Sequence, residues 1–253
     1  MRRYMVFSSL LAALLLAAEP KKTTPKDQPR VIVVTPLGIA PGVKTHLILR
    51  GLRLDSATEV RCQEPKATAK LLKKSKVGVP NQQNVNRVGD TQVEAEVTLP
   101  ADYPNRTVTL SVLTPAGESP AHDLLIDRIP VVAEKEPNNG FRQAQPLPLP
   151  QEVNGSIEQG KDVDLYRFEG KEGQQVTIEV FAVRYGSALD PLLTLYDSAG
   201  GILASCDDIA GSSDSRLDVT LPKTAAYFVG VSDANDQNGP AHVYRLSVRL
   251  TKP

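Results

Sequence analysis

The stretch QVEAEVTLP, residues 92–100, alternates apolar and polar side chains without a break. In an extended chain, successive side chains point to opposite faces. One face of this stretch would therefore carry four apolar side chains, Val93, Ala95, Val97 and Leu99. A period of two with one apolar face is typical of an antiparallel strand that is buried on one side and solvated on the other.

The same alternation recurs further along the chain, in RTVTLSVLTPAG (106–117), SRLDVTLP (215–222) and VYRLSVRL (243–250). In the last segment, Tyr244 and Leu246 are predicted to face a core and Arg245 to face solvent. No long segment after the N-terminal run has a 3.6-residue period. Aromatic residues make up 5% of the chain, and 20 prolines and 17 glycines favour short strands and turns. We predict an all-β protein of two β-sandwiches in tandem.

Two connections follow from turn residues and apolar runs. DLYRFEG (164–170) and QQVTIEVFAV (174–183) flank a Lys-Glu-Gly turn and are expected to pair as a hairpin. HDLLIDRIPVV (122–132) is expected to form one strand, which leads into the polar segment AEKEPNNG (133–140).

The N-terminus predicts export. Residues 1–18 combine Arg2 and Arg3 with an apolar run that is too short to span a bilayer, which is typical of a signal peptide. Residues 19–29 are charged and contain prolines, so a disordered tether is expected. We expect a secreted, periplasmic or cell-envelope protein without a membrane span after signal cleavage, with an uncleaved anchor as the alternative. The folded domains are predicted at 30–130 and 131–253.

Charge and cysteine content restrict the partners. Residues 131–253 carry 11 basic and 17 acidic side chains, a net charge of −6. A half this acidic argues against a nucleic-acid partner. Cys62 and Cys206 are expected to be small apolar residues near strand ends, and a disulfide between the domains is the alternative.

The residues from 134 onward resemble the bacterial pre-peptidase C-terminal domain. The resemblance rests on E-P-N-N (136–139), D-V-D-L-Y-R-F (162–168), L-T-L-Y-D-S-A-G (193–200), C-D-D (206–208), A-Y-F-V-G-V (226–231) and Y-R-L-S-V (244–248). It implies a jelly-roll-like sandwich that is appended to secreted proteases and is itself non-catalytic. The first domain resembles the immunoglobulin-like IPT/TIG domains through P-L-G-I-A-P-G (36–42), L-R-G-L-R-L (49–54) and V-T-L-S-V-L-T-P-A-G-E-S (108–119).

Catalytic motifs are missing from the sequence. There is no G-x-S-x-G elbow and no H-E-x-x-H pair. His46, His122 and His242 stand alone and are interpreted as surface histidines. We therefore predict a protein that is not an enzyme.

The segment 133–140 is a candidate cation site. Carboxylate and amide oxygens are the ligands that calcium prefers, and Glu134, Glu136 and Asn138 share one face of an extended chain. Asp162 and Asp164 share a face at the start of the next strand, and a cation would relieve their repulsion if the two segments meet. A turn held by asparagine side chains is the alternative. A second acidic loop contains Asp207, Asp208 and Asp214.

The family resemblance also implies calcium, because its collagen-binding members bind that ion through a similar acidic linker. Carrying the ligands over implies a site formed by Glu134, Glu136, Asn138, Asn139, Asp162 and Asp164. Asn139 stands where an aspartate is usual in those members, which removes one charge. The expected function is an exported binding or accessory module that docks on an extracellular or envelope protein or polysaccharide. The alternatives are a structural spacer of the envelope and an accessory subunit of a separate secreted hydrolase.

Overall fold

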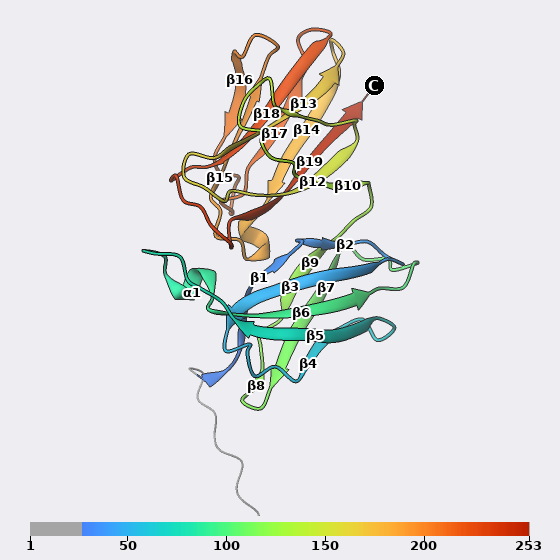
Figure 1. Ribbon diagram of the computed structural model, residues 1–253. Helices are drawn as coiled ribbons and strands as arrows, with labels where there is room; N and C mark the ends of the chain where they lie inside the picture. Colours follow the sequence, from blue (N-terminus) through green and yellow to red (C-terminus); the bar gives the residue numbers. More distant parts are fainter. Residues whose placement is uncertain (1–26, 253) are drawn as a thin grey trace, which may run out of the picture.

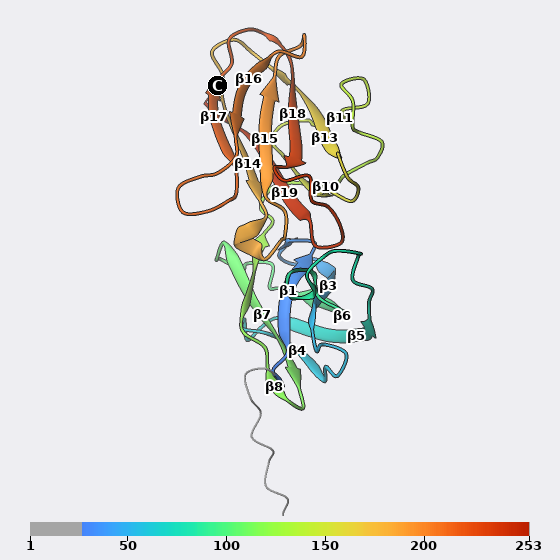
Figure 2. The same cartoon turned by 90° about the vertical axis from the view of Figure 1, so that its left-hand side faces the viewer.

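The computed structural model describes residues 27–252, so the predicted signal peptide and most of the tether lie outside the described residues. Two all-β lobes are stacked end to end, the N-terminal one below the C-terminal one in Figures 1 and 2. Each lobe is a β-sandwich with its own apolar core. The predicted fold class is confirmed.

The N-terminal lobe packs two mostly antiparallel layers against each other. The first layer has the order β1 (Arg30–Thr35), β3 (Lys44–Leu52), β6 (Thr91–Thr98) and β5 (Thr68–Lys76). The second has the order β2 (Gly38–Ile39), β9 (His122–Ile126), β7 (Thr107–Thr114) and β4 (Glu59–Cys62), with β8 (Gly117–Glu118) paired to β7. Val93, Ala95 and Val97 on β6 are fully buried between the layers, as their alternation predicts. A short helix, α1 (Val85–Val88), follows the edge strand β5.

The C-terminal lobe is built the same way. One layer has the order β10 (Val131–Ala133), β12 (Gln151–Ser156), β19 (Val243–Lys252), β14 (Gln175–Phe181) and β17 (Arg216–Thr220). The other has the order β11 (Gln145–Pro146), β13 (Val163–Gly170), β18 (Ala225–Asp233), β15 (Pro191–Tyr196) and β16 (Ile202–Cys206). A 3-10 turn, η2 (Val183–Tyr185), follows β14.

Two predicted connections are wrong. β13 and β14 lie in opposite layers, so the Lys-Glu-Gly turn carries the chain across the sandwich and does not close a hairpin. Both strands are buried along most of their length, and each takes its partners from distant strands, β18 for β13 and β19 for β14. The expected single strand 122–132 is two strands, because β9 belongs to the N-terminal lobe and β10 begins the C-terminal one.

The two lobes meet through a third apolar cluster. Leu37 and Val33 of the N-terminal lobe pack with Ala241 and Val243 of the C-terminal lobe. Gly186, which ends η2 with φ +82°, lies so close to the first lobe that an added Cβ would be 2.0 Å from the carbonyl oxygen of Ile32. Burial of apolar surface on both sides, together with this close approach, holds the lobes in one arrangement.

A buried arginine lies at the centre of the junction. Arg245 is expected to face solvent, but its side chain has no exposed surface. It donates to Asp127 Oδ1 at 2.6 Å, to Glu152 Oε2 at 2.8 Å and to Asn154 Oδ1 at 2.7 Å. The alternation of β19 correctly turns Arg245 away from the core of its own sandwich, and the neighbouring lobe then covers it.

Candidate functional site

The segment 133–140 joins the two layers of the C-terminal sandwich. At its start, Glu134 N donates to the carbonyl of Asn154 on β12 at 2.8 Å. Further along, the carbonyl of Asn138 accepts from Leu165 N on β13 at 3.0 Å. Because β12 and β13 belong to opposite layers, the segment crosses the edge of the sandwich and comes beside the first residues of β13.

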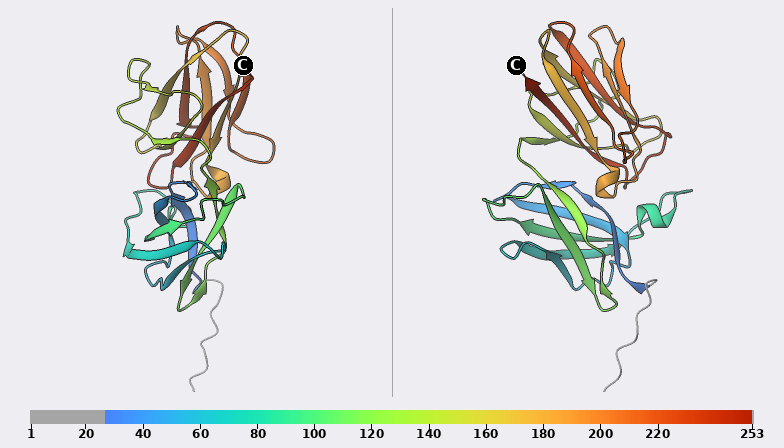
Figure 3. Two further views of the ribbon diagram at one scale, coloured as in Figure 1. Left: turned by 90° about the vertical axis from the view of Figure 1, so that its right-hand side faces the viewer. Right: turned by 180° about the vertical axis from the view of Figure 1, so that it is seen from behind.

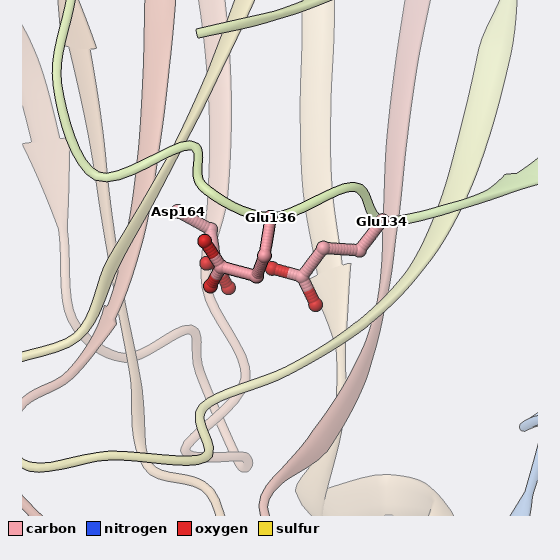
Figure 4. Close-up of side chains that lie close together, drawn as sticks. All are labelled: Glu134, Glu136 and Asp164. Atoms are coloured by element: carbon pink, nitrogen blue, oxygen red, sulfur yellow. The ribbon is translucent and has the colours of Figure 1, made fainter. Parts of the chain in front are cut away.

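This crossing brings three of the predicted ligands together. Glu134, Glu136 and Asp164 each offer a carboxylate oxygen, and these oxygens all lie within 4.8 Å of one another. Figure 4 shows Glu134 and Glu136 reaching from the segment towards Asp164. Glu136 is exposed, Glu134 is half-buried and Asp164 is completely buried, so the acidic cluster, as we call these three residues, runs from solvent into the protein.

Asp164 is the unusual member of the acidic cluster. Its Oδ2 accepts from the Tyr244 hydroxyl at 2.6 Å, and that hydroxyl is 2.6 Å from the hydroxyl of Tyr166. Its Oδ1 has no hydrogen-bond donor among the described residues. Burial, followed by a hydrogen bond with Glu134 and the negative charge of Glu134, raises the pKa of Asp164 to about 10. Without a positive charge beside it, this carboxyl takes up a proton at neutral pH.

No positive side chain compensates the acidic cluster. Within residues 27–252, neither lysine nor arginine forms an ion pair with Glu134, Glu136 or Asp164. Burial also raises the pKa of Glu136, and Asp162 and Glu134 add to that effect. The negative charge of the cluster is therefore not balanced by any side chain that the structure describes.

The other three predicted ligands hold the segment in place. Asn138 Nδ2 donates to Glu134 Oε1 at 3.1 Å, and Asn138 N donates to Glu136 Oε2 at 2.9 Å. With its amide nitrogen turned towards the acceptors, Asn139 donates to Asp162 Oδ1 at 3.0 Å. Asp162 Oδ2 accepts from Glu158 N at 3.1 Å and lies outside the acidic cluster. The structure thus contains the asparagine-held turn and the converging carboxylates at the same place.

The geometry fits a hard cation. Calcium binds oxygen ligands at about 2.3–2.6 Å, so two ligands on one ion are at most about 5 Å apart. The separations in the acidic cluster lie within that limit. The Oδ1 atom of Asp164, which accepts no hydrogen bond from the described residues, supplies a further ligand atom. Calcium at this place stays a prediction.

A second acidic group is weaker as a site and differs from the predicted one. It consists of Asp190, Asp207 and Asp208, two of which are exposed. Asp190 Oδ2 accepts from Asn235 Nδ2 at 2.8 Å. Asp214, which was expected beside Asp207, is instead fully buried and accepts from Ala182 N, Val183 N and Arg184, where it fixes η2.

The histidines do not form a nucleophilic site. His46 is exposed and lies 3.4 Å from Glu94. The surface interpretation is wrong for His242, which is buried, and for His122, which is mostly buried beside Gly186 of the C-terminal lobe. Burial lowers the pKa of each of these two imidazoles. In the described part of the chain, no histidine side chain hydrogen-bonds to a serine, threonine or cysteine side chain.

Sequence reasoning missed the tyrosine pair behind Asp164. The alternation predicts a core-facing position for Tyr244 and makes no assignment for Tyr166, and both side chains are fully buried. A tyrosine at a core-facing strand position needs a partner for its hydroxyl, and an acid at a neighbouring core-facing position is a natural one. That signal was present in D-V-D-L-Y, where Asp164 and Tyr166 share a face of β13.

The acidic cluster borders a groove between the lobes. This groove has a volume of about 550 Å³ and is lined by Glu134, Glu136 and Glu158 from the C-terminal lobe and by Arg50 and Gln92 from the N-terminal lobe. The Arg50 guanidinium donates to three backbone carbonyls, those of Gly78, Val88 and Gly89. It is therefore engaged within its own lobe and does not neutralise the glutamates.

Comparisons with known proteins agree with the predicted C-terminal domain. The family described as "Bacterial pre-peptidase C-terminal domain" matches residues 162–233, which confirms this resemblance for that part of the chain. A probable subtilase-type serine protease of Deinococcus radiodurans is 26% identical over 265 aligned positions, covering 88% of this chain and 33% of the protease. The chain thus spans about a third of the length of that relative. The IPT/TIG resemblance of the first domain stays a prediction.

Two solved structures are also similar. The pre-peptidase C-terminal domain of a Bacillus anthracis collagenase is 18% identical, with a TM-score of 0.35, and the match covers 42% of this chain and 94% of that domain. PliG of Aeromonas hydrophila, a periplasmic inhibitor of g-type lysozyme, is 16% identical, with a TM-score of 0.35, covering 49% of this chain and all of PliG. Within the described residues, no helix has the length and apolar character needed to cross a membrane.

Proposed function

We propose that this chain is an exported, non-catalytic accessory module whose C-terminal domain binds one calcium ion at the acidic cluster. The single observation that carries the calcium proposal is Asp164, a completely buried carboxylate with an unpartnered oxygen facing two glutamates. Leaving such a group charged and unpaired costs several kcal/mol, so an ionised Asp164 needs a cation. The accessory role is supported by the pre-peptidase C-terminal match.

The ion would be held by Glu134, Glu136 and Asp164, and would supply the positive charge that the chain lacks at this place. Glu134 is fixed by Ser156 N at 2.8 Å and by the amide of Asn138. Tyr244 orients Asp164 from behind through its hydroxyl. These residues therefore present carboxylate oxygens in a preset arrangement, which lowers the entropy cost of binding.

Calcium at this place would tie the lobe junction together. Glu134 immediately follows β10, and β10 immediately follows the connection between the lobes. A ligand that joins Glu134 and Glu136 to Asp164 fastens this connection to the second layer of the sandwich. We infer that the ion makes the two lobes a stiffer unit for docking on an extracellular protein or polysaccharide.

Thermal unfolding with and without calcium tests the metal proposal. A ligand that binds the folded state alone, at about a hundred times its dissociation constant, adds about 2.7 kcal/mol to the free energy of unfolding. For a domain of this size that corresponds to a rise of about 10 °C in the melting temperature. Magnesium at the same concentration is the control. An unchanged melting temperature in millimolar calcium would remove the metal from the proposal.

Turnover assays test the non-catalytic part. Purified chain, with and without calcium, is incubated with fluorogenic peptide, ester and glycoside substrates. We expect no release above the buffer blank. Turnover that rises in proportion to protein concentration, and that a single substitution abolishes, would show that the chain is an enzyme.

A structural spacer of the cell envelope is the second candidate. It is favoured by the apolar cluster and the buried Arg245 between the lobes, because both oppose bending. A spacer predicts no saturable binding of a partner to either lobe. The binding experiment of the following subsection separates this candidate from the accessory module.

A further inference from the structure

A second groove lies at the junction of the lobes. Its volume is about 860 Å³. The floor is the outer face of the layer β12–β19–β14–β17, where Glu152, Ser247, Glu179 and Arg216 form one row across neighbouring strands. The walls come from residues 102–107 and 125–129 of the N-terminal lobe and from η2, which lies against β9 (Figure 3). We call it the arginine groove.

Five arginines from both lobes line it: Arg106, Arg128, Arg184, Arg216 and Arg249. Its three acids are Asp102, Glu152 and Glu179. The two glutamates lie under the arginines, with 7% and 15% of their side-chain surfaces exposed. Glu179 accepts from Arg184 at 2.7 Å and Glu152 accepts from Arg245 at 2.8 Å and from Arg249. The negative charges of Glu152 and Glu179 are thus neutralised by arginines of the same chain.

Two arginines of the N-terminal wall have no acidic partner in the described part of the chain. Arg128 donates to the backbone carbonyls of Tyr103 and Asn105, at 2.5 and 2.9 Å. These bonds fix its guanidinium in position without neutralising it. Arg106 forms no ion pair with any described residue, and both side chains are exposed. Uncompensated, positioned guanidinium groups bind carboxylates in a bidentate manner.

Apolar and aromatic side chains lie between the arginines. Leu125, Ile129, Phe181 and Tyr185 line the groove and are each partly exposed. Arg184 lies over the ring of Phe181, 4.7 Å from its centroid, and so keeps its planar group oriented. A ligand that fills this surface needs apolar groups as well as negative charge.

We propose that the arginine groove binds an extended acidic polypeptide segment, in which glutamates or aspartates alternate with apolar residues. The inference rests on the accessory role proposed above, and gives that role a binding surface and a partner class. A uniformly charged polysaccharide is disfavoured, because it would set carboxylates against Glu152 and Glu179 and would leave the apolar lining without contacts. A peptide satisfies both kinds of surface.

Fluorescence anisotropy tests the proposal. The probe is a labelled peptide of about a dozen residues in which glutamate alternates with leucine and alanine. The salt concentration is about 0.15 M, at which charges more than about 8 Å apart are screened. Calcium is kept constant throughout. We expect saturable binding that Arg106→Glu and Arg216→Glu each weaken about tenfold, or about 1.4 kcal/mol. The two variants come from different lobes, so both losses together place the peptide in the groove between them.

Arg167→Glu is the matched control. Arg167 and Arg216 have 46% and 42% of their side chains exposed, and each pairs with the acid two residues further along its strand. Arg167, however, lies on β13 in the opposite layer. We expect this variant to bind like wild type, and circular dichroism checks that all three variants are folded. Should one not fold, the corresponding alanine variant replaces it.

Three results would overturn the proposal: no saturable peptide binding, an equal loss in Arg167→Glu, or tighter binding of polygalacturonate than of the peptide. Each leaves the calcium-dependent melting temperature untouched, so failure here is distinguishable from failure of the metal proposal. Conversely, if the chain binds the peptide but has the same melting temperature with and without calcium, the peptide proposal stands and the calcium proposal fails.

Discussion

The two grooves at the lobe junction contain similar numbers of acidic side chains, but they differ in whether arginines pair with these acids. In the arginine groove, Glu152 and Glu179 are covered by arginines of the same chain. In the groove beside the acidic cluster, Glu134 and Glu136 meet Asp164 without any cationic side chain among their described contacts. In the first groove the two floor glutamates are paired with arginines, and Arg106 and Arg128 have no acidic partner among the described residues. In the second groove Arg50 is bonded to backbone carbonyls, and no described cationic side chain pairs with the acidic cluster, which a proton or a bound cation could neutralise.

Arg245 separates the two grooves. Its guanidinium contacts Glu152, which lines the arginine groove, and Asn154, which lines the groove beside the acidic cluster. The third contact, Asp127, belongs to the connection between the lobes. The buried guanidinium hydrogen-bonds to all three groups in this arrangement of the lobes. In any other arrangement, Arg245 or one of its partners would be buried without a hydrogen bond, so this arrangement is favoured.

Removing this arginine should have the largest effect on stability. In Arg245→Met, the buried carboxylates Asp127 and Glu152 lose a cationic partner, and such a loss costs about 3–5 kcal/mol. Urea denaturation measures the free energy of unfolding. Arg167→Met, in the exposed face of the other layer, should change it by no more than about 0.5 kcal/mol. Equal changes in the two variants would show that Arg245 does not hold the junction.

Neutralising Asp164 should change the free energy of unfolding by an intermediate amount, and should raise it rather than lower it. In calcium-free wild type, this carboxyl must take up a proton that the unfolded chain has released at neutral pH, or stay charged without a cationic partner. Asp164→Asn avoids both costs, and its side-chain oxygen still accepts from Tyr244. We expect the calcium-free variant to be more stable than wild type by about 1–3 kcal/mol.

The same variant should no longer respond to calcium in thermal unfolding. Glu172→Gln, in the exposed turn between β13 and β14, is the control and should keep the wild-type response. A calcium-free Asp164→Asn protein that is less stable than wild type would contradict the account of the acidic cluster as a site with unbalanced charge.

The junction histidines should give the smallest effect, a loss of stability in acid. Burial lowers the pKa of His122 and His242, so the folded state binds protons less readily than the unfolded state does. Asp123 and Asp233 oppose this lowering, and Arg87 adds to it for His242. The stability that these neutral imidazoles contribute is complete above the unfolded pKa of about 6.5, and is lost as the pH falls towards their folded values.

A double variant, His122→Gln with His242→Gln, tests this sign. Between pH 7.5 and 5.5, its free energy of unfolding should fall less than that of wild type. His46→Gln, at an exposed position, should follow the wild-type curve. A double variant with an unchanged or steeper pH dependence would show that these imidazoles are not the acid-sensitive groups of the junction.

The two grooves also differ in how far the sequence predicts them. The acidic cluster could be predicted because Glu134 and Glu136 are adjacent on one extended segment, and Asp164 stands beside a recognisable strand start. Alternation alone gave the strands and their buried faces, as at β6 and β19. The sequence does not reveal which of the six predicted ligands converge and which, namely Asn138, Asn139 and Asp162, hold the segment in place. This difference depends on where the segment crosses the sandwich.

The arginine groove could not be predicted, because its walls come from both lobes. Alternation did place Arg216 and Arg249 on outward faces of their strands. It gave neither the strand order that sets Glu179 between Arg216 and Ser247 nor the position of the N-terminal lobe. The wrong hairpin between β13 and β14 has the same origin, since local turn residues do not reveal which distant strand becomes the partner. Alternation correctly predicts that Arg245 points away from the core of its own lobe, but it does not reveal that the other lobe covers this side chain.

Isothermal titration calorimetry with calcium tests the central claim, that the acidic cluster takes its missing positive charge from a bound ion. The account predicts saturable binding of about one ion per chain, with a dissociation constant in or below the millimolar range of extracellular calcium modules. It predicts the same binding in Glu172→Gln and none in Asp164→Asn. Absence of saturable binding to the wild-type protein, or undiminished binding to Asp164→Asn, would contradict it.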